Sequence, residues 1–174
     1  MVGYRRRYIG FKKTSELIAI SFGVSESAAN TFTQEEVSLQ LDVLNNEIFV
    51  VLAVDLNPTA PDLVAAQTTE TRALVSSTSN TAMVSLSNSN VIAEADLIIV
   101  SDAANSVPFT RAAEETYSGN LEYVALISTN NFFVAVKGTN NTAAKGSSGR
   151  IFGFRARADS ATYAALVQSE VLSA

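Results

Sequence analysis

Apolar residues recur at every second position along much of this chain, and this period limits the fold more than any other feature. In residues 17–24 four apolar side chains alternate with smaller or polar ones, and residues 37–43 repeat the pattern. Because successive side chains of a β-strand point to opposite faces, each segment predicts a strand with one buried face and one solvent face.

Turn-forming residues separate these segments and predict how they connect. Asn45 and Asn46 indicate a hairpin that joins residues 37–43 to a more apolar strand at 47–55. A second compact turn at 129–131 indicates a hairpin between residues 122–128 and 132–137.

Further short strands are expected between surface connections. Two prolines place residues 57–70 in a surface connection, because proline lacks the amide hydrogen that a central strand donates. Residues 102–107 indicate a turn, residues 111–117 have room for one helical turn, and residues 138–149 form a glycine-containing loop. The remaining strand candidates are residues 71–77, 82–86, 91–100 and 151–158. Eight to ten short strands with closely spaced turns indicate an all-β, antiparallel sandwich or barrel.

The C-terminal segment changes period and predicts a short helix over residues 161–172. Asp159 or Ser160 can cap its N-terminus. One helical face is expected to contain Tyr163, Leu166, Val167, Glu170 and Val171. This face needs a surface to pack on. Either the same subunit or a neighbouring subunit can provide it.

Charge divides the chain into a basic N-terminal arm, residues 1–16, and an acidic body, residues 17–174. The first thirteen residues contain five basic residues and no acid, whereas the rest of the chain holds seven basic residues against 17 acids. Charged residues are costly to bury, so the arm is expected to be flexible until it meets a polyanion. The five basic residues of the arm are Arg5, Arg6, Arg7, Lys12 and Lys13.

Three interpretations of the arm remain open. It can bind nucleic acid, contact an anionic membrane surface, or serve only as a solvated charge cluster. Five phosphate contacts on a single strand predict that log K falls with log salt with a slope of about −3.5. We expect no secretory signal, because the apolar stretch after the arm has only eight residues and no clean cleavage site. The apolar runs are also too short for a transmembrane helix.

The composition excludes several kinds of catalytic site. The chain has no cysteine and no histidine, so thiol nucleophiles, thiolate or histidine metal sites and Ser-His-Asp triads are all impossible. Asp55, Asn57 and Asp62 lack the pattern of a calcium loop. The pairs Glu94–Asp96 and Glu114–Glu115 are weak candidates for a glycosidase, and residues 146–150 lack the spacing of a phosphate-binding loop. We therefore expect no catalytic residue, metal, cofactor or small-molecule substrate.

A short tail with Tyr4, Arg5–Arg7 and Tyr8, followed by about 150 residues of short strands and polar loops, resembles viral capsid proteins of the single jelly-roll kind. The resemblance covers the whole chain in outline. It implies a single jelly roll whose basic tail, including Lys12 and Lys13, faces the genome inside a virion. It also implies many copies of the chain in one assembly.

The leading functional hypothesis is therefore a structural protein that self-assembles into a capsid shell. Shell contacts need no catalytic residues, and a closed symmetric assembly reuses each contact many times. The alternative is a β-sandwich binding module, such as a fibre-tip, decoration, carbohydrate-binding or receptor-binding protein, with its site on loops 57–70 and 138–149. A pilus or filament subunit ranks third, since the N-terminal segment is polar and basic.

Overall fold

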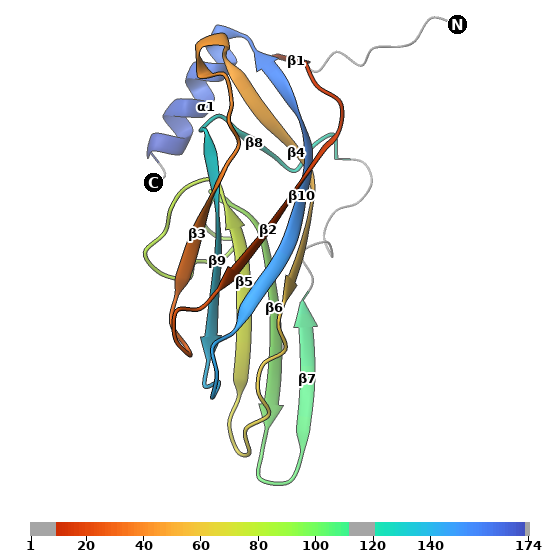
Figure 1. The fold of residues 1–174 in the computed structure, drawn as a ribbon, viewed down its shortest axis with the longest axis vertical. Helices are drawn as coiled ribbons and strands as arrows, with labels where there is room; N and C mark the ends of the chain where they lie inside the picture. The colour runs from red at the N-terminus through yellow and green to blue at the C-terminus, as the bar shows by residue number, and fades with distance from the viewer. Residues whose placement is uncertain (1–9, 112–120, 173–174) are drawn as a thin grey trace, which may run out of the picture.

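The computed structural model describes residues 10–111 and 121–172, and within these ranges the chain forms two antiparallel five-stranded sheets (Figure 1). The first sheet contains β1 (Phe11–Lys13), β2 (Ile18–Ser25), β4 (Glu47–Pro58), β8 (Ala125–Ile127) and β10 (Gly146–Ala158). The second sheet contains β3 (Thr33–Ser38), β5 (Thr69–Ser76), β6 (Val91–Ser101), β7 (Ser106–Arg111) and β9 (Asn131–Thr139). A 3-10 turn, η1 (Val43–Asn45), and a helix, α1 (Ser160–Leu172), complete the described elements.

The strand order is that of a single jelly roll. The first sheet runs β1-β10-β4-β8 with β2 also paired to β10, and the second runs β3-β9-β5-β6-β7. Without β1 and β7, eight strands remain in two sheets of four, ordered 2-10-4-8 and 3-9-5-6. The chain crosses between the sheets at every step except β5 to β6. This confirms the all-β sandwich, and its connections are those of a double-sheet jelly roll.

The main core lies between the sheets and follows from the alternation in the sequence. In β2, Ile18, Ile20, Phe22 and Val24 face the core, whereas the residues between them are exposed. Phe49 of β4 and Phe132 of β9 are fully enclosed there, and the rings of Phe22 and Phe132 meet edge to face at 5.8 Å. Apolar burial of this kind is the main term that favours the folded state.

Both hairpins expected from the sequence are wrong. Strand β3 pairs with β9, and β4 pairs with β8 and β10, so residues 37–55 cross from one sheet to the other. Leu39 and Leu41 are buried between these strands, and Gln40 has a φ of 51°, which breaks the extended conformation. Similarly, β8 and β9 lie in different sheets.

Several smaller expectations also need correction. Residues 82–86 form no strand and belong to the connection between β5 and β6. The arm predicted over residues 1–16 is not free throughout, because Phe11–Lys13 is the strand β1, paired with β10. Strand β10 starts at Gly146, inside the predicted loop 138–149, and β7 starts at Ser106. The candidate helical turn at 111–117 lies outside the described residues, apart from Arg111.

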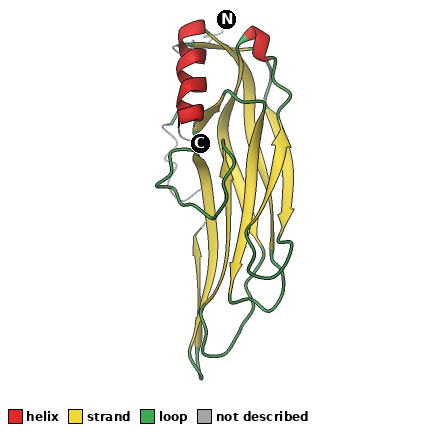
Figure 2. Ribbon diagram, turned by 90° about the vertical axis from the view of Figure 1, so that its left-hand side faces the viewer, coloured by secondary structure: helices red, strands yellow, loops and turns green. Residues whose placement is uncertain are grey.

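The C-terminal helix is confirmed, and it packs on its own subunit. Asp159 caps it by accepting a hydrogen bond from the Thr162 amide at 2.8 Å. Tyr163 and Leu166 pack on a second apolar cluster on the outer face of the first sheet, which contains Phe11, Ile48, Val50, Phe154, Ala156 and Ala158. Figure 2 shows the helix standing against one end of the sandwich.

Glu170 is the buried residue of this helix, although its side chain is polar. Its carboxylate accepts hydrogen bonds from the Ser128 amide at 3.1 Å and the Ser128 hydroxyl at 2.8 Å. A buried carboxylate with two donors ties the helix to the start of the β8–β9 connection. The helical spacing placed Glu170 on the packed face, and this interaction explains why it is there.

We predict that Gly153→Ala destabilises the sandwich strongly, whereas Gly23→Ala does not. A Cβ on Gly153 would collide with the Val50 carbonyl and come within 2.6 Å of the Phe49 ring. A Cβ on Gly23 would meet only the Ser147 carbonyl, at 3.8 Å. Overpacking of this kind costs about 2–3 kcal/mol, and urea unfolding of the two variants measures the difference. Equal losses in the two variants would contradict the close packing of β4 on β10.

Candidate nucleic-acid interface

The pairing of β1 with β10 brings two basic side chains together. Lys12 lies directly opposite Arg157 in the antiparallel register, and both side chains are exposed. Residues opposite each other in such a pair point to the same face, where like charges repel. No ion pair in the described part of the chain involves either residue. On its other side, Arg157 lies opposite Glu47 of β4, whose carboxylate pairs with Arg155 at 3.4 Å. The side of Arg157 that faces Lys12 therefore favours an additional anion.

Phe11 anchors β1 and so fixes Lys12. Its side chain is buried in the second apolar cluster and meets the Tyr123 ring edge to face at 5.9 Å. The Asp159 amide donates to the Gly10 carbonyl at 2.9 Å, and Gly10 has a φ of 92°, which few residues other than glycine adopt. The basic N-terminal segment thus enters the first sheet at a defined point.

A shallow cavity of about 480 Å³ opens beside this pair, lined by Lys12, Arg157, Thr14 and the backbone around Gly10. Asp159 also lines it. The hydrogen bonds of this carboxylate to the Thr162 amide and side chain lower its pKa, so it is ionised at neutral pH. The cavity is therefore lined by two basic side chains, Lys12 and Arg157, and one acidic side chain, Asp159. The Asp159 carboxylate also caps the helix α1 by accepting the Thr162 amide hydrogen bond.

Lys13 is positioned differently from Lys12. Its ammonium group lies 5.1 Å from the centre of the Phe154 ring and 3.9 Å from the Glu16 carboxylate. Both contacts are exposed enough to be exchanged for a phosphate. Of the five predicted arm residues, Lys12 and Lys13 are thus in a strand, and Arg5, Arg6 and Arg7 lie outside the described residues.

Arg157 was not predicted as a site residue. The sequence shows Arg155 and Arg157 alternating with apolar residues, but it does not show which strand lies beside them. Arg155 has a structural role, since its guanidinium donates to the carbonyls of Leu39 and Gln40 and pairs with Glu47 at 3.4 Å. Arg157 instead remains exposed next to Lys12, and only the register of β1 on β10 reveals this.

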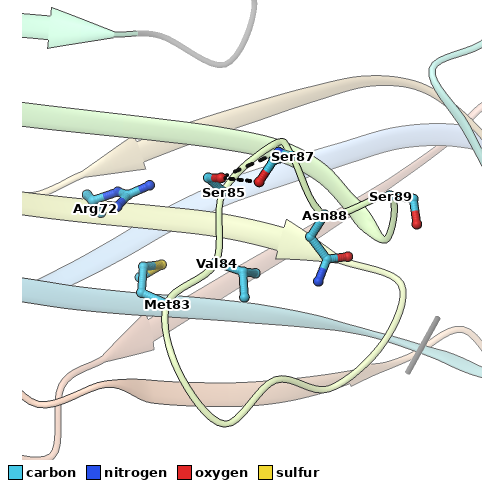
Figure 3. Close-up of a pocket in the computed structure, with 7 residues that line it drawn as sticks. All are labelled: Arg72, Met83, Val84, Ser85, Ser87, Asn88 and Ser89. Atoms are coloured by element: carbon cyan, nitrogen blue, oxygen red, sulfur yellow. Dashed lines mark hydrogen bonds between the residues drawn. The ribbon is translucent and has the colours of Figure 1, made fainter.

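A second candidate site lies on the outer face of the second sheet. The β5–β6 connection folds over this face and borders an open cavity of about 800 Å³ (Figure 3). The cavity is lined by Arg72, Met83, Val84, Ser85, Ser87, Asn88 and Ser89. Arg72 is its charged member and forms an ion pair with the buried Glu94. Burial lowers the pKa of Arg72, but the hydrogen bond and charge of Glu94 outweigh burial and raise it overall.

The carboxylates considered as a glycosidase pair have other partners. Glu94 binds Arg72 and accepts a hydrogen bond from the Leu86 amide at 3.1 Å, and Asp96 lies 3.7 Å from the Arg111 guanidinium. Neither lines the cavity. Each carboxylate thus forms an ion pair with an arginine on the outer face of the second sheet. The pair Glu114–Glu115 lies outside the described residues.

The loops proposed for a binding module are held by a polar network at the other end of the sandwich. Asp62 accepts hydrogen bonds from the Thr142 amide, the Thr142 hydroxyl, the Ala143 amide and the Lys145 ammonium group, at 2.5–3.1 Å. The buried Glu26 accepts from the amides of Gly138 and Lys145. These contacts tie the two loops to each other and to the β2–β3 turn.

The network includes Asp62, one of the residues compared above with a calcium loop. The oxygens of Asp62 are occupied by protein donors, and no cluster of three or more acidic side chains that fits a metal occurs within residues 10–111 and 121–172. The glycine-containing segment 146–150 is the first part of β10. In the same ranges, no helix is long and apolar enough to cross a membrane.

Comparisons with known proteins give few matches. No protein-family model matches the sequence, and no curated protein sequence matches it either. Among solved structures, the chain is similar to one titled Desmodium yellow mottle tymovirus, with a TM-score of 0.32 and 15% identity over 92% of this chain and 98% of that chain. A weaker match is the tailspike protein gp49 of Acinetobacter baumannii bacteriophage Fri1, a capsular polysaccharide depolymerase. It has a TM-score of 0.16 and 14% identity over 76% of this chain and 19% of that chain.

We predict that Asp62 makes the fold more stable above pH 4 than below it. The hydrogen bonds from Lys145 and Thr142 lower the pKa of Asp62 well below its ordinary value of 3.8. A carboxylate with a lowered pKa in the folded state stabilises that state above its unfolded pKa, and this stabilisation is lost as the pH falls through the folded pKa.

The test compares the thermal stability of the wild type and Asp62→Asn between pH 7 and pH 2. Asp62→Asn should unfold at a lower temperature at pH 7, and the difference should shrink below pH 4. Asp55→Asn, which changes an exposed carboxylate of β4, is the control. A difference that is constant with pH would contradict the assigned role of the ionised carboxylate.

Proposed function

We propose that this chain is a structural protein that self-assembles into a viral capsid shell, with its basic N-terminal segment facing the genome in the virion. The observation that carries the proposal is that β1 attaches this segment to a jelly roll and places Lys12 opposite Arg157. Neither of these basic residues forms an ion pair within the described residues. The jelly roll is a fold that many viral shells use, although lectins and cupins share it.

The separation of charge supports this role. The acidic body would repel nucleic acid, so binding depends on the N-terminal segment and the cations beside it. One segment with a few cations binds weakly on its own. Many copies on the inner surface of one shell act together, because each bound segment raises the effective concentration of the next.

The internal chemistry of the described residues fits a structural role and no enzymatic one. Three ion pairs involve partly buried side chains, namely Arg72–Glu94, Lys145–Asp62 and Arg155–Glu47. The buried Glu26 and Glu170 accept hydrogen bonds from amide and hydroxyl groups. The serine hydroxyls in the cavity on the second sheet, Ser85 and Ser87, bond to each other at 2.8 Å, and the neighbouring Glu94 carboxylate is paired with Arg72. We therefore infer binding and assembly, and no catalysis.

A carbohydrate-binding role is the second candidate, and the serine-lined cavity is the feature that favours it. Three hydroxyls, an amide and an arginine beside Met83 suit a ligand with many hydroxyl groups. A glycan array separates the two functions. Binding that disappears in Asn88→Ala would support the second candidate. A subunit that assembles and binds no glycan would support the first.

We predict that neutralising the arm empties the shells without preventing their assembly. The variant replaces Arg5, Arg6, Arg7, Lys12 and Lys13 with glutamine and keeps Phe11, because deleting the whole segment would also remove Phe11 from the second apolar cluster. Particles of the variant should lose most co-purified nucleic acid, measured by the ratio of absorbance at 260 and 280 nm. Variant particles that keep their full nucleic acid content would refute the role of the arm.

We also predict a measurable contribution of Arg157 to the salt dependence of binding. Each phosphate contact on a single strand contributes about 0.7 to the slope of log K against log salt. Fluorescence anisotropy with a labelled single-stranded oligonucleotide should give Arg157→Gln a slope that is shallower than the wild type by about 0.7. Arg150→Gln, on the same strand and exposed but paired with β2 and β4, is the control.

Two outcomes would contradict the Arg157 assignment. The first is equal slopes for the wild type and Arg157→Gln. The second is equal losses in Arg157→Gln and Arg150→Gln, which would mean that general charge and not the site matters. Vesicles containing anionic lipid provide a further comparison, and binding to these vesicles with no binding to the oligonucleotide would assign the arm to a membrane surface.

A further inference from the structure

Strand β7 forms an edge that is exposed on both sides. It lies at the edge of the second sheet (Figure 1). All six of its residues are exposed, and they include Val107 at 52% and Phe109 at 55%. In the register with β6, Val107 lies opposite Val100, and Phe109 lies opposite Ile98. These four apolar side chains therefore share one face, which we call the β6–β7 patch. It is the outer face of the second sheet.

Exposed apolar patches on a folded surface usually mark an interaction site. Strand addition at the free edge of β7 is disfavoured, because Pro108 sits in the middle of this strand. Within a sheet, proline is confined to places where the missing amide hydrogen would face away from the neighbouring strand. The free edge of β7 therefore lacks a donor at its centre. A partner on this face would instead contact the side chains of the patch.

The same chain carries an exposed apolar tip near the opposite end of its long axis. Leu44 of η1 is 93% exposed, and its neighbour Val43 is 46% exposed. Figure 1 places β7 in the lower half of the molecule. Figure 2 shows the short η1 turn at the top, beside the end where α1 lies.

The backbone that presents Leu44 is held firmly in place. The Asp42 carbonyl accepts hydrogen bonds from the amides of Asn45 and Glu47, both at 3.1 Å, and the Glu47 carboxylate accepts from the Asp42 amide at 2.8 Å. Asn46 adopts the left-handed conformation, and its carbonyl accepts from the Ala158 amide at 3.0 Å. The turn is thus preorganised, yet its largest apolar side chain points into solvent. Preorganisation lowers the entropic cost of binding.

We propose that Leu44 of one subunit packs on the β6–β7 patch of a neighbouring copy, so that subunits contact each other head to tail. This inference rests on the proposed function, since it names one of the contacts that build the shell. The residues beside the two surfaces carry opposite charges: Asp42 flanks the tip, and Arg111 borders the patch. Arg111 lies 3.7 Å from Asp96, but its side chain is 57% exposed, so it is also accessible to a neighbouring carboxylate.

A contact between two different surfaces has a direct consequence for assembly. Such a heterologous contact closes into rings or continues along an array, whereas a contact of the patch with itself makes only dimers. Four side chains and one tip are also far smaller than the roughly 800 Å² per partner of a stable pairwise interface. The contact is therefore weak in an isolated pair and effective only when it is repeated. It also requires the long axis of the subunit to lie along the wall of the shell.

Cysteine cross-linking tests this contact cleanly, because the chain has no cysteine of its own. Leu44→Cys and Phe109→Cys are purified separately with tags of different mass, mixed, allowed to assemble and treated with a short bismaleimide. Both positions are exposed, so neither change removes a core contact, and circular dichroism checks the fold. Leu63→Cys, at an exposed leucine on the β4–β5 connection, replaces Leu44→Cys in the control mixture.

The expected result is a covalent dimer that contains one chain of each kind, formed only in the mixture of Leu44→Cys and Phe109→Cys. A dimer of Phe109→Cys alone would mean that the patch packs on itself. Equal yields with Leu63→Cys would mean random collision. Either result, or shells that form without the mixed dimer, overturns the inference and leaves the proposed function standing. A mixed dimer in a sample that never forms shells would keep the contact and refute the capsid function.

A second readout is independent of cross-linking. Leu44→Asp should raise the protein concentration needed for assembly by about tenfold or more, because it removes one buried leucine contact for each subunit. Leu63→Asp should leave this concentration unchanged. Light scattering against protein concentration measures both. An unchanged concentration for Leu44→Asp would overturn the proposed contact.

Discussion

The pairing of β10 with β4 is the interaction on which the rest of the structure depends. Strand β10 spans thirteen residues and pairs with β4 on one side and with β1 and β2 on the other. The fit is close because Gly149 and Gly153 let the β4 backbone and the rings of Phe22 and Phe49 approach β10. A larger residue at either position would separate the strands.

Each functional feature is attached to this strand or to its ends. The start of β10 follows Lys145, which binds Asp62 and closes the loop end of the sandwich. Its last residues hold β1, and so place Lys12 beside Arg157. The helix α1 follows directly and covers the outer cluster. The Ala158 amide also holds η1 in place through Asn46. A single long strand thus connects the polar network, the basic site and the exposed tip.

Much of the fold could be predicted from the sequence, but the partners of the strands could not. The period of two predicted β2 and its buried face, and the change of period predicted α1, because both are local properties. Residues 37–43 show the same period, but only residues 37 and 38 belong to a strand, at the end of β3. The wrong hairpin at residues 37–55 shows the limit. Leu39 and Leu41 are fixed by Asn130, whose backbone and side-chain oxygens accept hydrogen bonds from their amides at 2.8 and 2.5 Å. No local pattern indicates a contact across about ninety positions.

The candidate site, like the fold, could be predicted from the sequence only in part. The basic residues of the arm were evident from the charge pattern, since no acid separates them. Arg157 was not, because it lies 145 positions from Lys12 and becomes part of the site only through the register of β1 on β10. The β6–β7 patch also depends on register, as Ile98 and Val100 share a face with Phe109 and Val107 only in the paired strands.

Electron cryo-microscopy of the assembled protein tests the central claim most directly, namely that this jelly roll is a wall unit with a basic inner surface. The account predicts closed shells in which the long axis of each subunit lies along the wall, with Lys12 and Arg157 on the inner surface next to nucleic acid density. Subunits that stay monomeric at every salt concentration, or shells with this basic pair on the outer surface, would contradict it.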